Sequence, residues 1–319
     1  MKDKILIGSS GTGTAFGIIS NIKNKFGDKV EIYTMDMLPD NLCTASIFSK
    51  KHFQVPKLSD KNFEKEFAKI LLDNKISTFI PILNEELLIA YKFKKNKEFE
   101  HIDFWSSKIY SDLTSKENSY KFLNKIGVEV PFSVYSYDEF LKMNKSGIIF
   151  IKPKIGIGSK DAGEHRLENL KLDRKFFNKY LLQEVCVNPE ITVDSFYDPN
   201  NGELYVFCRE RIEVKSGVSV KVRLFFDDDL YNIAKSIAIS INQVGAICFQ
   251  VMLNKKNNYV VTDLNLRTGA GTNMTCSAGF NILSANYALR KSIPYQDDLR
   301  KIESDEEYII TRQYTDFLM

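Results

Sequence analysis

Three polar side chains alternate along the stretch TDLNLRTGAGTN, which runs from residue 262 to 273. Asp263, Asn265 and Arg267 are spaced two residues apart and follow an apolar Val-Val pair. Because strand side chains point to alternate faces, all three emerge on one face if the strand stays regular. If this face is simply exposed to solvent, the three side chains have no catalytic or binding role. A carboxylate, an amide and a guanidinium together would instead suit a metal ion and a phosphate group.

A preceding apolar run, AICFQVML, is predicted to pair with this strand through the four-residue turn KKNN. If Asn254 pairs with Tyr259, Gln250 lies directly opposite Asp263, and opposed residues share a face. A buried glutamine amide needs partners, and the opposite strand offers them. Gln250, Asp263 and Asn265 would form a cluster of oxygen donors. With three histidines in the chain, such a cluster favours Mg²⁺, with Mn²⁺ as the alternative.

Basic residues upstream could hold phosphates. Lys152 ends the apolar strand GIIFIKP, where a lysine is costly without an anionic partner. The turn GSKDAG follows and includes Gly158 and Ser159, whose backbone N–H groups could cover phosphates. Lys116 lies at the start of a predicted helix, where free N–H groups also favour an anion. Taken singly, the turn could be an ordinary glycine turn and Lys116 an ordinary surface lysine.

Composition sets limits on the class of protein. The chain has 319 residues, a net charge of +3 and a 44% hydrophobic fraction, which favours two or three globular subdomains. This charge balance gives no case for a nucleic-acid or membrane surface. The apolar run before Gly8 is too short for a signal peptide. Five widely spaced cysteines without a CxxC pair indicate a reduced, cytoplasmic setting. A homo-oligomer is left open.

Two folding patterns follow each other along the chain. Up to about residue 107, apolar strands alternate with helices, beginning with KILIG and VEIYTMD (30–36), which predicts a wound parallel α/β sheet. Beyond it, longer alternating strands and fewer helices predict α+β structure with antiparallel strands. The fold class is therefore α/β followed by α+β.

Several segments follow one another in the second part of the chain: a lysine before a helix ending in LNKIGVEVP, then IIFIKP, the Gly/Ser loop, LLQEVCVNPEITVD, RERIEVKSGVS, FQVML and DLNLR. In this order they resemble the ATP-grasp superfamily. The stretch 108–290 is most similar to the half-unit of the carbamoyl phosphate synthetase large subunit and to stand-alone carboxylate–amine ligases. The resemblance implies a wound domain at 1–107, an ATP-grasp small lobe with a mobile glycine loop at 108–186, and a large lobe with the metal site at 187–319.

The resemblance also implies roles for single residues. Lys116 and Lys152 would contact ATP phosphates, with Lys152 also near the adenine, under a mobile loop at 156–163. Arg267 would stabilise the transferred phosphoryl group, and Arg211 would face the substrate or the γ-phosphate. Gln183, Glu184 and Val185 would line the adenine slot, and Glu190 would bind the ribose. The metal ligands would be Gln250, Asp263 and Asn265.

Asp263 departs from the family pattern, which has glutamate there in most members. Gln250 matches the carbamoyl phosphate synthetase pattern. The aspartate carboxylate is set back by roughly an ångström, and Mg²⁺ demands near-ideal geometry. Metal affinity could therefore fall, or one ion could be lost.

Three functions are open at this point. The leading one is a ligase that activates a small carboxylate with ATP as an acyl-phosphate, which an amine or similar nucleophile then attacks. The second is an ATP-binding regulator or degenerate homologue without ligase activity, for which Asp263 is the main support. The third is a dinucleotide-dependent dehydrogenase, but its GxGxxG fingerprint is broken because Phe16 stands where the third glycine belongs.

Overall fold

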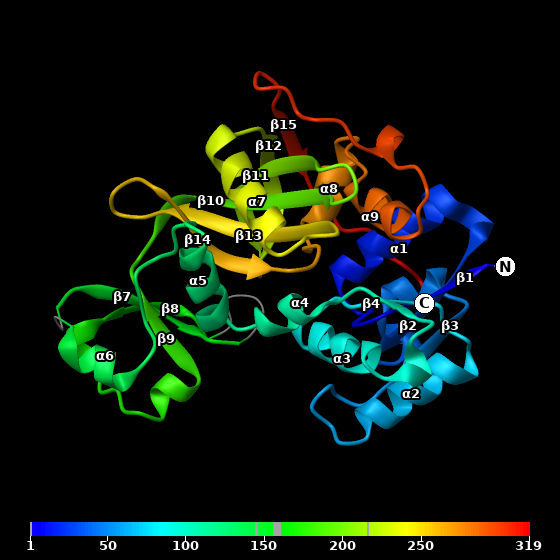
Figure 1. Ribbon diagram of the computed structural model, residues 1–319, viewed down its shortest axis with the longest axis horizontal. Helices are drawn as coiled ribbons and strands as arrows, with labels where there is room; N and C mark the ends of the chain where they lie inside the picture. The colour runs from blue at the N-terminus through cyan, green and yellow to red at the C-terminus, as the bar shows by residue number, and fades with distance from the viewer. Residues whose placement is uncertain (1, 144–145, 156–160, 216) are drawn as a thin grey trace.

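The computed structural model describes residues 2–143, 146–155, 161–215 and 217–319. Its strands form three sheets, which belong to a wound domain, a small lobe and a large lobe (Figure 1). No helix in these ranges is long and apolar enough to cross a membrane. The fold class predicted from the sequence, α/β followed by α+β, is confirmed.

The first sheet is parallel, with strand order β3-β2-β1-β4-β5. The helix α1 begins after Thr12, whose hydroxyl accepts a hydrogen bond from the Ala15 amide, and ends at Gly27, where φ is +51°. That φ favours glycine, which has no Cβ to clash. The elements are β1 (Asp3–Ile7), α1 (Gly13–Phe26), β2 (Val30–Asp36), β3 (Lys51–Gln54), α2 (Phe63–Asp73), β4 (Thr78–Ile80), α3 (Asn84–Lys94) and β5 (Asp103–Phe104).

The small lobe is a sheet of four short antiparallel strands with order β6-β9-β7-β8. Figure 1 shows it apart from the wound domain, at the other end of the molecule. The elements of this stretch are α4 (Lys108–Asp112), α5 (Lys116–Lys125), β6 (Ser133–Val134), α6 (Tyr137–Lys142), β7 (Ile148–Pro153), β8 (Gly163–Arg166) and β9 (Tyr180–Gln183).

The large lobe is a six-stranded antiparallel sheet with order β14-β13-β10-β11-β12-β15. Buried residues of α7 and α5, including Leu230, Ile237 and Tyr120, share a core with Val193 and Phe249 of the sheet. Its elements are β10 (Val187–Asp198), β11 (Glu203–Lys215), β12 (Val218–Phe225), α7 (Asp228–Ser240), β13 (Gly245–Leu253), β14 (Tyr259–Asn265), α8 (Thr272–Ser277), α9 (Ile282–Arg290) and β15 (Tyr308–Thr311).

One hydrophobic core joins the wound domain to the large lobe. Ile19, Ile22 and Phe26 of α1 are buried in the same cluster as Ala285 and Tyr287 of α9. The Phe26 and Tyr287 rings meet edge to face with centroids 4.8 Å apart. The two helices therefore close one continuous core, although more than 250 residues separate them in the chain. The domain boundaries at 107/108 and 186/187 stay predictions.

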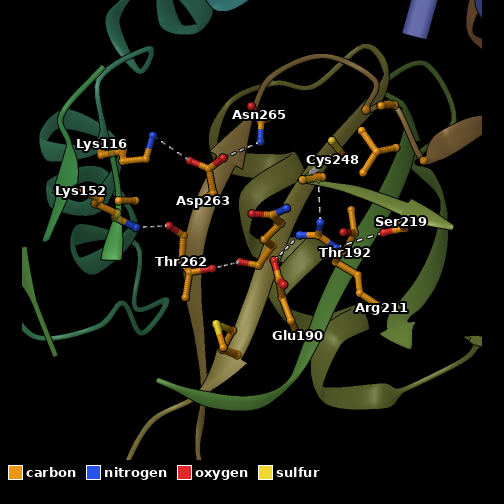
Figure 2. A pocket seen from close by; sticks show the side chains of 18 of the residues that line it. Lys116, Lys152, Glu190, Thr192, Arg211, Ser219, Cys248, Thr262, Asp263 and Asn265 are labelled. Carbon is orange, nitrogen blue, oxygen red and sulfur yellow. Dashed lines mark hydrogen bonds and ion pairs between the residues drawn. The ribbon is translucent and has the colours of Figure 1, made fainter. Parts of the chain in front are cut away.

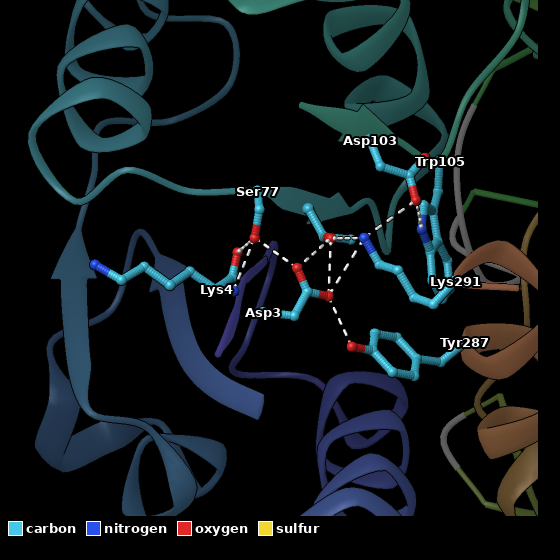
Figure 3. Close-up of polar contacts among 8 residues, drawn as sticks. Asp3, Lys4, Ser77, Asp103, Trp105, Tyr287 and Lys291 are labelled. Carbon is cyan, nitrogen blue, oxygen red and sulfur yellow. Dashed lines mark hydrogen bonds and ion pairs between the residues drawn. The ribbon is translucent and has the colours of Figure 1, made fainter. Parts of the chain in front are cut away.

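Polar contacts reinforce this interface beside the start of β1 (Figure 3). The Lys291 Nζ lies 3.3 Å from the Asp3 carboxylate and 3.6 Å from that of Asp103. The Tyr287 hydroxyl donates to Asp3 at 2.7 Å. Arg290, next in the chain, stacks over the Trp105 ring at 4.8 Å. The end of α9 is thus fastened to the edge of the parallel sheet.

Candidate functional site

A cavity of about 570 Å³ opens where the three parts of the chain meet. One face of the large sheet lines it, and residues of β7, β8 and β9 line it from the small lobe. Figure 2 shows Lys116 and Lys152 on one side of this space, facing Asp263 and Thr262 of β14. Ten of the thirteen residues predicted for the site line this cavity: Lys116, Lys152, Gln183, Val185, Glu190, Arg211, Gln250, Asp263, Asn265 and Arg267. Gly158 and Ser159 lie outside the described residues, and Glu184 does not line the cavity.

The hairpin predicted under the site is present, with a corrected register. Gln250 pairs with Asp263 as expected. Near the turn, however, Tyr259 pairs with Leu253 and not with Asn254, and an irregularity between Gln250 and Val251 restores the expected register. The assumed pair at the turn was wrong by one residue, and the bulge compensates for the shift.

The oxygen-donor residues occupy one face, as the alternation predicted. The Asn265 amide donates to the Asp263 carboxylate at 2.9 Å, and Lys116 Nζ lies 3.4 Å from the same carboxylate. Burial raises the pKa of Asp263, but Lys116, Lys152, the Asn265 hydrogen bond and Arg267 together hold that pKa below its ordinary value. Asp263 is therefore an anion at neutral pH.

The Gln250 side-chain amide differs from the expectation. The opposite strand was expected to supply its partners, yet its amide makes no hydrogen bond to any described residue, and it lines the cavity. An amide oxygen in this position is free to accept a ligand. One carboxylate and two amides, with phosphate oxygens and water completing the shell, fit Mg²⁺. No group of three or more His, Cys, Asp or Glu suited to a metal occurs in the described ranges.

Lys152 is buried beside this cluster, with 7% of its surface exposed. Its Nζ donates to the Tyr120 hydroxyl at 2.6 Å. It also donates to the Thr262 carbonyl at 2.8 Å (Figure 2). Burial lowers its pKa to about 7; Asp263 opposes this shift and Lys116 adds to it. Within the part of the chain that the structure describes, the Lys152 ammonium contacts neutral oxygens and forms no ion pair with a carboxylate, so it can still neutralise a bound anion.

The residues predicted for the adenine slot separate into two groups. Gln183 and Val185 line the cavity, and the side-chain oxygen Oε1 of Gln183 accepts a hydrogen bond from the Tyr120 hydroxyl at 3.0 Å. Glu184 points elsewhere, because its carboxylate accepts the Phe132 amide at 2.7 Å. Cys186, which was not predicted, lines the cavity beside Val185.

Arg211 and Glu190 form an ion pair on the cavity wall. The other Arg211 nitrogens donate to Ser219 Oγ at 3.0 Å and to the Gly217 carbonyl at 2.9 Å. Protein acceptors thus engage all three guanidinium nitrogens. Arg267 has an unused donor, because its Nε is buried without a hydrogen-bond partner among the described residues.

Several lining residues were not predicted from the sequence. Thr192, Arg209 and Ser219 belong to the large sheet, and Glu164 belongs to β8. The alternation of β11 carried a signal for Arg209, since it stands two residues before Arg211 and so shares its face. Glu164 lies in a short polar strand that has no apolar pattern.

The carboxyl edge of the parallel sheet closes the remaining side of the cavity. Thr12, Gly13 and Thr14 after β1, with Ile82 and Leu83 after β4, line it. Glu86 supports this edge from below, because its buried carboxylate accepts the amides of Ile82 at 2.7 Å and Leu83 at 3.0 Å. Open α/β sheets bind ligands at this edge.

Comparison with known proteins supports the resemblance found in the sequence. Residues 176–310 match a family model described as ATP-grasp in the biosynthetic pathway with Ter operon. N5-carboxyaminoimidazole synthetase from Staphylococcus aureus, complexed with ADP, superposes with a TM-score of 0.73 at 14% identity, over 98% of this chain and 83% of that one. The chain has the ATP-grasp fold.

Two further ATP-grasp structures extend this likeness. Biotin carboxylase from Campylobacter jejuni, in its beta-gamma-ATP complex, gives a TM-score of 0.74 at 14% identity, over 97% of this chain and 75% of that one. L-amino acid ligase from Bacillus licheniformis gives 0.67 at 11% identity, over 91% and 74%. No curated protein matches the sequence. At these identities the solved structures establish the fold alone.

Proposed function

We propose that this chain is an ATP-dependent ligase, which activates a small carboxylate as an acyl-phosphate for attack by an amine or related nucleophile. One observation carries the proposal: two lysines from one side and an Asp-Asn-Arg row from the other face the same cavity. Phosphoryl transfer asks the protein mainly for positioning and charge neutralisation. This set of side chains can supply both.

ATP would lie between the lobes, with its phosphates between Lys116, Lys152 and Arg267. Gln183 and Val185 would border the adenine, and Glu190 would accept from ribose hydroxyls while Arg211 holds its carboxylate in place. Gln250, Asp263 and Asn265 would hold Mg²⁺. When bound, the ion would draw charge from the phosphate oxygens.

The acceptor carboxylate would attack the γ-phosphorus, and ADP would leave. The free Nε of Arg267 would then donate to the developing acyl-phosphate. The nucleophile would approach from the carboxyl edge of the parallel sheet, where Thr12 and Gly13 line the cavity. Covered by the small lobe, the acyl-phosphate would be kept from water.

ADP release tests this function. The protein would be incubated with ATP and Mg²⁺ against a panel of amino acids and small carboxylates, with and without an amine. Lys116→Met should lower kcat/KM at least 10-fold, because it removes a phosphate contact. Lys121→Met is the matched control, since this lysine lies one turn further along α5, exposed and paired with Glu117. Failure to bind ATP with the fold intact would reject the whole class.

A second function has one observation in its favour. Asp263 is the single carboxylate of the predicted metal set, and Lys116 already lies 3.4 Å from it. A protein that binds ATP without turning it over would be consistent with that arrangement. Calorimetry would then show ATP binding while no carboxylate on the panel releases ADP.

A further inference from the structure

A buried arginine on the cavity wall has no part in the function proposed above. The Arg209 side chain is 1% exposed. Its Nε donates to Asp194 Oδ2 at 2.8 Å and its Nη2 to Oδ1 at 3.1 Å. Thr272 and Thr275 donate their hydroxyls to the same carboxylate at 2.8 and 2.7 Å. With four donors on Asp194, the guanidinium is fixed in one orientation.

The third guanidinium nitrogen of Arg209, Nη1, does not bind Asp194. It has no hydrogen-bond acceptor among the residues that the structure describes, although both Arg209 and Gly271 line the cavity. This nitrogen faces the Gly271 backbone so closely that a Cβ at Gly271 would lie 2.1 Å from it. Gly271 therefore leaves room for the nitrogen at the cavity.

Positive charge exceeds negative charge around this point. Arg312 donates to the Ala270 carbonyl at 3.0 Å, one residue from Gly271, and burial together with Arg209 lowers the pKa of Arg312. Arg267 lies on the other side of the same turn. Within the described ranges, Asp194 is the one carboxylate in ion-pair contact with any of these three arginines. Partly buried cations of this kind are stabilised by a bound anion.

This point is separate from the predicted metal cluster. Arg209 pairs with Thr192, Thr192 pairs with Gln250, and Gln250 pairs with Asp263, so these residues form one row across four strands. At about 4.8 Å per strand, the Cα of Arg209 lies about 10 Å from that of Gln250. The phosphates and the reacting carboxylate belong at the Asp263 end of the row.

We propose that Arg209 binds a second carboxylate of the acceptor, which makes the substrate a dicarboxylate. In naming the occupant as substrate, this rests on the ligase function proposed above. The free Nη1 and the guanidinium edge beside it can hold a planar, singly charged carboxylate. They match this group better than a doubly charged phosphate group. Arg209 would then select among carboxylates by the length between the two acidic groups.

Binding without ATP tests the site independently of catalysis. Calorimetry would compare linear dicarboxylates, from malonate to adipate, with the monocarboxylate of equal carbon number. At least one dicarboxylate should bind 10-fold or more tightly than its partner. Gly271→Ala should reduce this preference below 3-fold, because a Cβ 2.1 Å from the present position of Nη1 must displace that nitrogen, while Arg209 and Asp194 both keep their charges. The Gly271 backbone, at φ −86°, has a conformation that alanine can adopt, so the Cβ acts through its contact with the guanidinium.

Two further variants complete the test. Arg209→Lys should also lose the preference, since an ammonium cannot hold Asp194 through two parallel hydrogen bonds and reach the cavity as well. Arg223→Met is the control, because this arginine of β12 forms ion pairs with Glu210 and Glu307 and does not line the cavity. It should keep the preference.

The outcomes separate this inference from the ligase proposal. A dicarboxylate preference that Gly271→Ala abolishes supports the site even if no ADP is released. The absence of ADP release would by itself reject the ligase. ADP release with monocarboxylates alone, or a preference unchanged in Gly271→Ala, would overturn the role of Arg209 and leave the ligase standing.

Discussion

Replacing Lys152 with methionine should stabilise the fold at neutral and acidic pH, although it removes a lysine expected to contact ATP. The Lys152 ammonium is buried, and among the described residues it donates only to neutral acceptors, the Tyr120 hydroxyl and the Thr262 carbonyl. Burial lowers the pKa of Lys152 from the ordinary lysine value of 10.5 to about 7. The folded state therefore disfavours the charged form.

The sign of the pH dependence follows from these two pKa values. Below pH 7 both states hold the proton, and the folded state carries the full cost of burying the charge. Between pH 7 and 10.5 the unfolded chain keeps the proton that the folded chain has lost, so stability rises with pH across this window. The full difference is about 5 kcal/mol, and about 2.5 kcal/mol of it falls between pH 6 and 9.

Urea unfolding of both proteins without nucleotide, at pH 6, 7.5 and 9, measures this contribution. Subtracting the wild-type free energy of unfolding from that of Lys152→Met cancels the other titrating groups. The variant should gain most at pH 6, and its advantage should shrink by about 2.5 kcal/mol by pH 9. Lys121→Met, which removes an exposed lysine, should show no such trend. A difference between Lys152→Met and wild type that is flat or grows with pH would refute the reasoning.

Three other predictions concern separate parts of the molecule. Asp263→Glu should tighten Mg²⁺-dependent ATP binding several-fold, because one more methylene moves the carboxylate outward by roughly an ångström; calorimetry showing equal or weaker binding would contradict this. Cys186 is the one cysteine of the five that is not buried, and burial raises its pKa to about 11. Its alkylation by iodoacetamide should accelerate about 10-fold per pH unit from pH 7 to 9, and ATP should slow it; mass spectrometry that finds another cysteine modified first would count against this. Lys291→Met should destabilise the fold by about 1 to 2 kcal/mol, because it leaves Asp3 and Asp103 without their shared cation; a loss below about 0.5 kcal/mol in chemical unfolding would mean that solvent screens the cluster.

Local patterns were sufficient for much of the fold. The strand predicted at 30–36 coincides with β2, and the hairpin that brings Gln250 opposite Asp263 is present. Six strands were missed, β3, β5, β6, β8, β12 and β15. The GEHR sequence of β8 is polar and four residues long, and β15 lies in a charged segment, so neither shows the apolar alternation that indicates a strand.

The sequence was sufficient to predict which types of residue line the site, but not which partners their side chains contact. Lys152 was singled out because a lysine in an apolar strand needs a partner, and it lies at the cavity. Arg209 was missed because its significance depends on burial beside Asp194, 15 residues away on the neighbouring strand. The side-chain direction of Glu184 was also out of reach, since it is set by the amide of Phe132, 52 residues earlier.

The core shared by α1 and α9 has a consequence for how the chain is made. Ile19, Ile22 and Phe26 are synthesised more than 250 residues before Ala285 and Tyr287, which cover them. Until then the nascent wound domain presents an apolar helix face to its surroundings, where chaperones or other chains can bind it. A fragment ending near residue 107 would keep that face uncovered, so the first third of the chain is continuous in sequence without being independent in stability.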